Sequence, residues 1–465
     1  MTVIAGVLSG VIIAGLAAYH GLSLVMIVLA AGELRRQRWM LKRRLERLAR
    51  ESGALAGVSV VVPAYNEEVS IVRTVTSILR AQYPDLELIV VSDGSTDRTL
   101  SVLARTFALR PSNRRVGGGL PTQAVRAVFE SATDARLIVV DKRNGGKGDA
   151  LNAGINMATK PLLLATDADV VLDSFAIVHL ALAFAIDPTV VATSGMIRPH
   201  NGCAIERGRI SRVALPARSI ELLQIVEYLR AYGIGRLFFN RFNAHLIISG
   251  ALGLFSRQLL LEIGGYQPHA IAEDMELVVR IHRHCAERQR PYRVWFSADA
   301  LCWTEAPRTL VDLGNQRTRW HLGLLSVLRV NRRMTFNARY GAAGLLAFPF
   351  FGLELYAPAL DALGWLTLPA LWAAGVLTGD WMVLWLEVAV LLSVTVSLAA
   401  VFLDAVGFAL FRRPLDRLTL VACALIEHVG YRQWTVYCRL RAFYRYYRTI
   451  QLKSTWRSPS RMAVR

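Results

Sequence analysis

The chain has 465 residues, of which 54% are hydrophobic, and a formal net charge of +19. Its mean hydropathy of +0.36 is too high for an ordinary soluble protein, and its 19% of charged residues are too many for a protein made only of membrane spans. These values predict a soluble domain combined with several membrane segments. The five cysteines have no paired spacing, which argues against a disulfide framework and suits a reducing compartment.

The first predicted element is the apolar run 3–31, which is long enough to cross a bilayer as a helix. Eight Lys or Arg residues follow within 33–50. A signal peptide would carry its basic residues before the apolar run, so a membrane helix fits better. We expect an N-terminal transmembrane helix at 1–33 and a basic juxtamembrane segment at 34–56, with residue 35 onward in the cytosol.

The segment from 57 to about 200 alternates apolar, β-branched runs with helical spacing. Strands are predicted at 58–65, 86–95, 136–142 and 161–169, and helices at 67–81, 97–107 and 148–159. Buried strands joined by crossover helices predict an open, mostly parallel α/β sheet. Residues 111–135, which contain three consecutive glycines, predict a surface loop or insertion.

After residue 340 the composition becomes that of membrane helices. Apolar stretches lie at about 342–360, 362–378, 381–411 and 418–438. The basic tail 439–465 and the pair Arg412 and Arg413 are all expected on the cytosolic side. Two crossings within 342–411, with 418–438 in or near the interface, satisfy both requirements, and four crossings are the alternative.

The basic residues are concentrated beside the apolar runs. A net charge of this size fits either nucleic acid or an anionic membrane surface. The clusters flank predicted spans, and no nucleic-acid-binding module is recognisable. The sequence therefore favours the lipid bilayer as a partner and excludes nucleic acid.

Polar residues follow each predicted strand of the soluble part. Ligands of an open α/β sheet bind beyond the carboxyl ends of its strands, so these loops should share one crevice. The loops contain "PAYNEE" at 63–68, Asp93, Lys147, and the pair Asp167 and Asp169. Acids, glycines and a lysine in one place suit a phosphate-bearing ligand with a divalent metal.

Each of these loops also has a simpler interpretation. Asp167 and Asp169 point to the same side of an extended segment and repel each other unless a cation lies between them, but an exposed loop pair is the alternative. Gly145 and Gly146 could cradle a phosphate or only form a turn. Asp93 precedes a glycine and could likewise be a turn residue.

Two further clusters lie closer to the C-terminus. Glu273 and Asp274 lie at the start of a predicted helix. Either they are there only because acids are favourable in a first helical turn, or one of them acts as a general base for a hydroxyl group. Gln316, Arg319 and Trp320 are spaced to lie together on one helix. An arginine can bind a pyrophosphate, and an indole can form the base of a sugar site. The alternative is an amphipathic helix at the membrane surface.

Taken in order, these motifs resemble the processive membrane glycosyltransferases of family 2, which include cellulose, hyaluronan, chitin and poly-N-acetylglucosamine synthases. The matching motifs, over about 57–325, are "VVVPAYNEE", "VSDGSTDRT", "GGKGDALNAG", "DAD", "AED" and "QRTRW". "AED" together with "QRTRW" is most similar to the poly-N-acetylglucosamine synthase type. The resemblance implies a cytoplasmic GT-A-type α/β domain at 57–330 with interface helices near its end, followed by transmembrane or interfacial helices at 340–438.

The resemblance also implies a role for each matching residue. The nucleotide would be bound by Ala64, Tyr65, Glu67, Asp93, Lys147 and Asp167, with Asp93 at the uracil and Lys147 at the diphosphate. Asp169 would reach a Mg²⁺ or Mn²⁺ ion, and Asp274 would be the catalytic base. The diphosphate and the acceptor would be held by Glu273, Gln316, Arg319 and Trp320.

The implied reaction is inverting transfer from a UDP-sugar, UDP-N-acetylglucosamine or UDP-glucose, to a growing β-linked polysaccharide. The implied location is the cell (inner) membrane, crossed more than once, with an accessory membrane subunit as a further partner. "AED" replaces the "TED" of cellulose synthases, and no gating-loop pattern follows "QRTRW". Two alternatives therefore stay open: addition of one sugar to a lipid-linked acceptor, and a catalytically silent regulatory membrane subunit.

Overall fold

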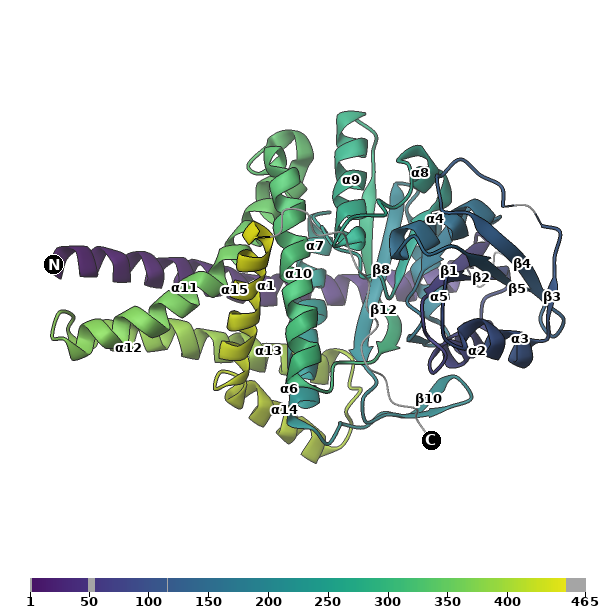
Figure 1. Ribbon diagram of the computed structural model, residues 1–465. Coiled ribbons are helices and arrows are strands. Elements are labelled where there is room, and N and C mark those ends of the chain that lie inside the picture. The colour runs from purple at the N-terminus through teal and green to yellow at the C-terminus, as the bar shows by residue number, and fades with distance from the viewer. Residues whose placement is uncertain (1, 49–54, 115, 449–465) are drawn as a thin grey trace. The chain divides into compact units, whose positions relative to one another are not determined.

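The computed structural model describes residues 2–48, 55–114 and 116–448, which form two compact units (Figure 1). The sheet unit consists of Arg36–Val213 and Asn243–Ala306, and the helical unit of Met1–Arg35, Ala214–Phe242 and Pro307–Ile450. The predicted basic segments reach beyond the described residues, at 49–54 and at 449–465. The segments 214–242 and 307–330, predicted within the soluble domain, are grouped with the apolar helices.

A ten-stranded sheet forms the centre of the sheet unit, in the order β3-β4-β5-β2-β1-β6-β11-β8-β12-β7. Its strands are β1 (Val58–Ala64), β2 (Leu86–Asp93), β3 (Leu109–Pro111), β4 (Val125–Ser131), β5 (Leu137–Lys142), β6 (Leu162–Ala165), β7 (Val171–Leu172), β8 (Val190–Pro199), β11 (Gly253–Ser256) and β12 (Arg293–Thr304). A separate hairpin contains β9 (Ala204–Glu206) and β10 (Arg209–Arg212).

The central strands run in parallel, as the buried apolar runs predict. β1 pairs in parallel with β2 and β6, and β2 pairs in parallel with β5. Every residue of β1 and β2 is buried, which explains why both strands read as continuous hydrophobic runs. The carboxyl ends of these four strands therefore meet at one edge of the sheet. β11 is antiparallel to both of its neighbours, so the sheet is mixed.

Helices cover the sheet. They are α2 (Ile71–Leu79), α3 (Thr99–Phe107), α4 (Lys147–Met157), α5 (Ala176–Ile186), α8 (Arg257–Glu262) and α9 (Glu273–Glu287). One buried core joins Val61 and Ile89 of the strands to Leu151 of α4 and Leu277 of α9. α4 approaches β1 closely because Gly154 lies against Val61, where a methyl group would collide. This contact fixes α4, and with it the loop that precedes α4.

The prediction of a loop throughout 111–135 is wrong for residues 125–131, which form β4. This strand pairs antiparallel with β5 and β3 near the edge of the sheet. Only Val128 and Ser131 of β4 are fully buried. A strand with so little burial lacks the hydrophobic alternation on which strand prediction depends.

Helices dominate the helical unit. They include α1 (Thr2–Leu48) as far as residue 35, α6 (Ser219–Tyr228), η1 (Leu229–Arg236), α7 (Leu237–Arg241), α10 (Leu310–Val330), α11 (Phe348–Ala373), α12 (Gly379–Leu386), η5 (Glu387–Leu391), α13 (Leu392–Gly407), α14 (Pro414–Ile426) and α15 (Tyr431–Arg448). Within the described ranges, three stretches are long and apolar enough to cross a membrane: Val3–Met40, Ala343–Ala373 and Gly379–Gly407. Two of the three lie within 342–411, where two crossings are expected.

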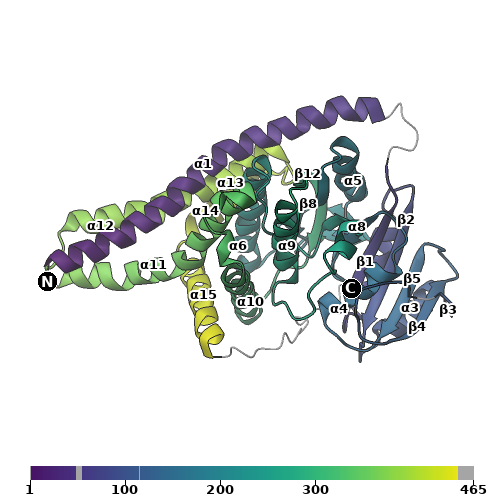
Figure 2. The ribbon, with the colours of Figure 1, turned by 90° about the horizontal axis from the view of Figure 1, so that it is seen from above.

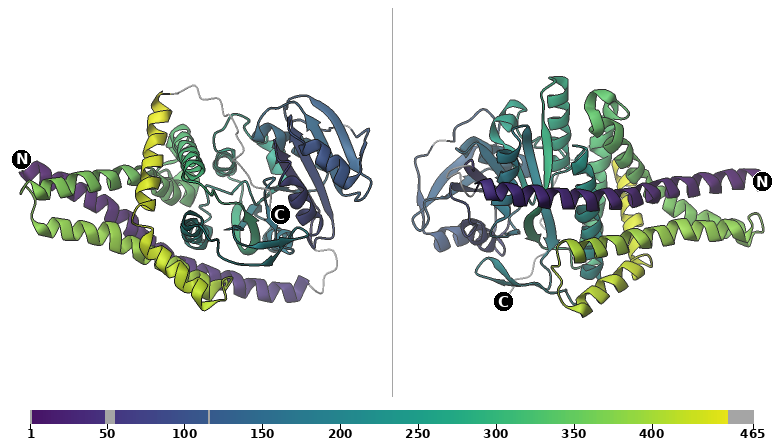
Figure 3. Two further views of the ribbon diagram at one scale, coloured as in Figure 1. Left: turned by 60° about the horizontal axis from the view of Figure 1, so that its bottom comes forward. Right: turned by 180° about the vertical axis from the view of Figure 1, so that it is seen from behind.

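Packing in the helical unit joins segments that are distant in the sequence. Ile12 and Leu16 of α1 form a core with Leu368 of α11 and Trp385 of α12, and Figure 2 shows these helices lying alongside one another. α15 lies beside α10, as Figure 3 also shows. The Thr318 hydroxyl of α10 donates to the Cys438 carbonyl of α15 at 3.1 Å.

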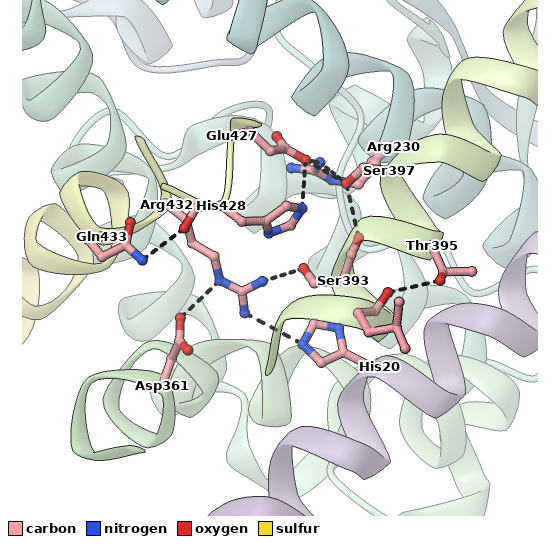
Figure 4. Close-up of polar contacts among 11 residues, drawn as sticks. His20, Arg230, Asp361, Ser393, Thr395, Ser397, Glu427, His428, Arg432 and Gln433 are labelled. Atoms are coloured by element: carbon pink, nitrogen blue, oxygen red, sulfur yellow. Dashed lines mark hydrogen bonds and ion pairs between the residues drawn. The ribbon is translucent and has the colours of Figure 1, made fainter. Parts of the chain in front are cut away.

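Buried ion pairs cross the interior of the helical unit (Figure 4). Arg432 on α15 donates through Nε to Asp361 Oδ2 on α11 at 3.0 Å, and its other nitrogens contact Ser393 and His20. A polar group in an apolar interior is costly unless it is paired, so this arginine ties α1, α11, α13 and α15 together.

A second buried cluster lies in the same unit. Arg230 of η1 pairs with Glu427, and the Ser397 hydroxyl of α13 donates to Glu427 Oε1 at 2.5 Å. Arg230 also donates to Ser397 at 2.7 Å. Each carboxylate in these two clusters faces one guanidinium, so their charges cancel.

Candidate active site

Asp93 ends β2 and shapes the glycine-rich turn that follows β5. Its side chain is fully buried. Its Oδ1 accepts hydrogen bonds from Lys142 Nζ at 2.5 Å and the Gly145 amide at 3.0 Å, and its Oδ2 accepts from the Gly146 amide at 2.8 Å. Gly146 has a φ of +90°, a conformation that glycine adopts without strain. The turn is therefore built around a carboxylate, and Lys147 begins α4 directly after it.

Lys142, which the sequence reasoning missed, lies beneath this turn. Its ammonium group is fully buried between Asp93 and Asp149, at 2.5 Å from each, and donates to the Arg143 carbonyl at 2.6 Å. Lys142 is the register partner of Asp93 across β2 and β5. Aligning the C-terminal ends of the two predicted strands as parallel neighbours would have revealed this contact.

Lys147 brings three of the predicted loops together. Its Nζ lies 2.8 Å from Asp167 Oδ1 and 3.0 Å from Glu273 Oε1. Burial alone would lower the pKa of Lys147, but the charges of Asp167, Glu273 and Asp274 outweigh it and raise this pKa well above its usual value. A cation therefore already lies among these carboxylates, at the carboxyl edge of the sheet.

Asp167 and Asp169 follow β6 on a loop that is held from two sides. The Thr166 hydroxyl donates to the Ala251 carbonyl at 2.7 Å, and the Thr74 hydroxyl donates to the Ala168 carbonyl at 2.8 Å. The side chain of Asp167 is 33% exposed. Among the described residues no group of three or more His, Cys, Asp or Glu side chains is arranged to hold a metal. The pair instead matches sites in which one or two carboxylates share a hard cation with a substrate phosphate.

Asp274 lies in the first turn of α9, partly buried, where its Oδ1 accepts a hydrogen bond from the Met275 amide at 2.8 Å. Burial, and then the neighbouring Glu273 charge, raise the pKa of Asp274 to about 6, while Lys147 and the amide oppose the rise. The sequence could not decide between burial and the helix terminus, and in the structure burial prevails. A carboxylate with this pKa suits a general base near neutral pH.

The predicted residues of the first loop lie at the same edge of the sheet. Ala64 ends β1, Tyr65 is half-buried, and Glu67 is buried. The Glu67 amide donates to Thr99 Oγ1 at 2.8 Å, and its carboxylate accepts from the Ser70 hydroxyl at 2.6 Å. The loops after β1 and β2 are thus tied together.

Gln316, Arg319 and Trp320 lie on α10, one helix as their spacing predicts, in the helical unit. Arg319 is exposed, and Trp320 exposes 46% of its surface. Arg317, which was read only as part of the motif, is buried between them. The roles of these residues, and of those in the sheet unit, remain predictions.

Comparison with known proteins supports this set of motifs. The model of glycosyl transferase family 2 matches residues 59–264, and that of glycosyl transferase family group 2 matches residues 212–411. The two matches include the edge of the sheet with its carboxylates, and α10. The chain belongs to glycosyltransferase family 2. The resemblance inferred from the motifs and the GT-A-type fold class are both confirmed.

Named relatives of this family 2 glycosyltransferase come from staphylococci. Poly-beta-1,6-N-acetyl-D-glucosamine synthase of Staphylococcus epidermidis is 26% identical over 285 residues, which is 61% of this chain and 58% of that protein. The synthase of Staphylococcus aureus strain COL is 27% identical over 275 residues, 59% of this chain and 56% of that protein. The similarity thus spans a little over half the length of these relatives.

A solved structure is also similar to the chain. The mannosyltransferase PcManGT from Pyrobaculum calidifontis, in complex with GDP-Man and Mn²⁺, has a TM-score of 0.47 and 20% sequence identity. The alignment covers 89% of this chain and 99% of the mannosyltransferase.

Proposed function

We propose that the protein is an inverting, metal-dependent membrane glycosyltransferase that moves a sugar from a UDP-sugar to a growing β-linked polysaccharide. The observation that carries the proposal is the cluster around Lys147. There, three carboxylates from two loops face one ammonium group at the edge of the sheet where ligands of such folds bind. The excess negative charge suits a metal-bound diphosphate.

The donor side of the proposed site consists of the loops after β1, β2, β5 and β6. Asp93 holds the glycine turn, and the uracil would lie against this region with Ala64, Tyr65 and Glu67 nearby. The Lys147 ammonium group now pairs with the carboxylates of Asp167 and Glu273. When the donor binds, the diphosphate oxygens would take the place of these carboxylates as its anionic partners. Asp167 would contribute to nucleotide binding.

A divalent ion, Mg²⁺ or Mn²⁺, would be held by Asp169 with Asp167, because two carboxylates and a diphosphate provide the oxygen ligands these ions prefer. Once bound, the ion supplies neutralisation of the charge that develops on the leaving diphosphate.

Asp274 would act as the base in a single displacement. The acceptor oxygen forms a bond to the anomeric carbon while the bond from that carbon to the UDP oxygen breaks, and UDP leaves with the electron pair. The acceptor proton passes to the Asp274 carboxylate. Attack from the face opposite UDP inverts an α-linked donor to a β-linked product. Glu273, Gln316, Arg319 and Trp320 would hold the diphosphate and the acceptor.

The relatives suggest the sugar and the setting. Because both named relatives are poly-beta-1,6-N-acetyl-D-glucosamine synthases, UDP-N-acetylglucosamine is the first donor to test and UDP-glucose the second. The three apolar stretches support a multi-pass protein of the inner membrane. The basic segment after the first stretch supports a cytoplasmic catalytic domain. An accessory membrane subunit would be a further partner.

The decisive experiment supplies a panel of UDP-sugars to the full-length protein reconstituted in lipid nanodiscs, and measures UDP release and product length together. A ladder of long products from one UDP-sugar is expected. Addition of a single sugar to an extracted lipid would replace the polymer proposal by the lipid-acceptor alternative. Nucleotide binding without UDP release would favour the silent subunit.

Metal removal tests the role of Asp169. EDTA should abolish UDP release, and Mg²⁺ or Mn²⁺ should restore it, because the diphosphate leaves slowly without a cation. Turnover that continues undiminished in EDTA would refute a metal at this site.

A further inference from the structure

Arg317 lies in the middle of the α10 motif, between Gln316 and Trp320, yet it has a different environment from both. Its side chain is only 2% exposed, whereas Gln316 is partly exposed and Trp320 is 46% exposed. A buried guanidinium costs free energy unless its hydrogen bonds are met. Its partners therefore indicate what this arginine does.

Arg317 contacts both neighbouring motif residues. Its Nη1 donates to Gln316 Oε1 at 2.5 Å, and its Cζ lies 4.3 Å from the centre of the Trp320 ring. The first contact is a charge-assisted hydrogen bond and the second a cation–π contact. One guanidinium group thus restricts the side chains of two residues assigned to the diphosphate and the acceptor.

Arg317 is itself held by two other helices. Its Nη2 donates to Glu227 Oε2 of α6 at 2.6 Å, and the Tyr431 hydroxyl of α15 donates to the same oxygen at 2.7 Å. Burial alone would raise the pKa of Glu227, but Arg317, Arg439 and the Tyr431 hydroxyl lower it to about 2. Glu227 is therefore ionised throughout the physiological range and remains a fixed partner.

These contacts determine what Gln316 can offer a ligand. An arginine has only donors, so its Nη1 must face the amide oxygen of Gln316 and not the amide nitrogen. The amide NH₂ group is then left to donate to other partners, and a donor complements phosphate and hydroxyl oxygens. Trp320 is restricted in the same manner: the guanidinium covers one face of the indole, and the other face can receive a sugar ring.

We propose that Arg317 is a positioning residue, held by Glu227 and Tyr431, which fixes the amide of Gln316 and the indole plane of Trp320 for the acceptor end of the substrate. The inference deepens the proposed function and rests on it. Arg317 touches neither the donor nor the reacting atoms, and it acts through its two neighbours on α10.

The test uses the full-length protein in nanodiscs, with the UDP-sugar that gives the wild type its highest turnover and a short oligosaccharide of the product as acceptor. Arg317→Met should lower kcat/KM for the acceptor by about 10- to 100-fold, because misplaced substrate-positioning groups have effects of this order. UDP affinity should fall less than kcat/KM for the acceptor does, because Gln316 is one of several residues assigned to the diphosphate and the predicted nucleotide residues lie in the sheet unit. Arg317→Lys keeps the charge but not the planar fork, so it should restore activity only in part.

Arg329 provides the matched control. It lies on the same helix over the Tyr446 ring, at 5.5 Å, but is exposed. Arg329→Met should leave kcat/KM for the acceptor unchanged. An equal loss in both variants would show a general effect of removing an arginine from α10 and would overturn the inference.

Non-additivity distinguishes positioning from a purely structural role. In a Gln316→Ala, Trp320→Ala background, Arg317→Met should lower kcat/KM for the acceptor by less than about a further two-fold, since the two side chains that Arg317 positions are gone. A full further loss in that background would refute the inference. If Arg317→Met does not assemble, Tyr431→Phe removes one hydroxyl only and should still lower kcat/KM for the acceptor, by about two- to five-fold. Wild-type kinetics in Tyr431→Phe would refute the proposed anchor.

The two proposals fail in different ways. If the wild type releases no UDP from any UDP-sugar, the proposed function fails. If the wild type is active and Arg317→Met has the same acceptor kinetics, only the positioning role fails.

Discussion

Charges are arranged differently in the two units. Around Lys147 in the sheet unit, one ammonium group faces three carboxylates, and its side chain is 18% exposed. In the helical unit three guanidinium groups, from 2% to 28% exposed, are each paired with one carboxylate: Arg432 with Asp361, Arg230 with Glu427, and Arg317 with Glu227. A balanced buried pair stabilises a fold without further partners, whereas an excess of accessible negative charge favours a cation or its complex. The first arrangement fits the proposed substrate site, and the second fits a role in holding the helices together.

The largest effect is expected at the base. Asp274→Asn keeps the size and burial of the side chain but cannot accept a proton. Turnover should fall by about 10²- to 10⁴-fold, the usual contribution of a general base. UDP affinity, measured by calorimetry, should stay within about two-fold of the wild type. Near-normal turnover in this variant would place the base elsewhere.

A variant of Lys142 tests whether a buried charge inside the sheet unit stabilises the fold. Lys142→Met leaves Asp93 and Asp149 buried without their counter-charge, and we expect a loss of about 3–5 kcal/mol in the free energy of unfolding. Denaturation followed by circular dichroism measures it. Lys160→Met is the control, because Lys160 pairs with the half-exposed Asp85 and should cost less than about 1 kcal/mol. Similar losses in both variants would contradict this assignment of Lys142.

The balanced pairs of the helical unit are tested by removing one partner or both. Arg432→Leu or Asp361→Leu alone should destabilise the detergent-solubilised protein by about 3 kcal/mol, because each leaves an unpaired buried charge. The double variant should be clearly more stable than either single variant in thermal unfolding. If the stability lost in the double variant equals the sum of the two single losses, Arg432 and Asp361 do not stabilise the protein as a pair.

The smallest expected effect is on the pH profile. Since the pKa of Asp274 is about 6 and only its ionised form accepts a proton, kcat/KM should decline below about pH 6. The positive charge of Lys147 favours the ionised form. Lys147→Met should therefore move the acidic limb toward higher pH, in assays at saturating donor. A shift toward lower pH would contradict the proximity of these two groups in solution.

The sequence predicted the parallel core of the sheet well because the central strands are mostly apolar and β-branched. It also brought Asp167 and Lys147 to one site, since both follow strands at the same edge, whereas Glu273 was assigned to this site only through the family resemblance. Local spacing could not give the partners of Asp93, because Lys142 is 49 residues away. Strand β4 was missed since its few buried residues give no clear period.

Arg317 shows a second limit of reading motifs. Within "QRTRW" the residues with assigned roles attract attention, and the arginine between them reads as one more surface cation. Its burial depends on Glu227, 90 residues earlier, and on Tyr431, more than 100 residues later. Such a contact follows from the packing of α6, α10 and α15, and no local sequence pattern predicts it.

The two hydroxyl contacts that hold the loop of Asp167 and Asp169 would affect which ion the proposed metal site accepts. Thr166 and Ala168 are each anchored to a different neighbouring segment, so the backbone between the two aspartates has little freedom to widen. A rigid pair of carboxylates discriminates cations by ionic radius. Small ions with strict octahedral coordination tolerate such a frame, whereas the larger Ca²⁺ needs longer bonds and more ligands. At the proposed metal site, ion selectivity would thus depend partly on Thr74 and Thr166, which are not among the proposed ligands.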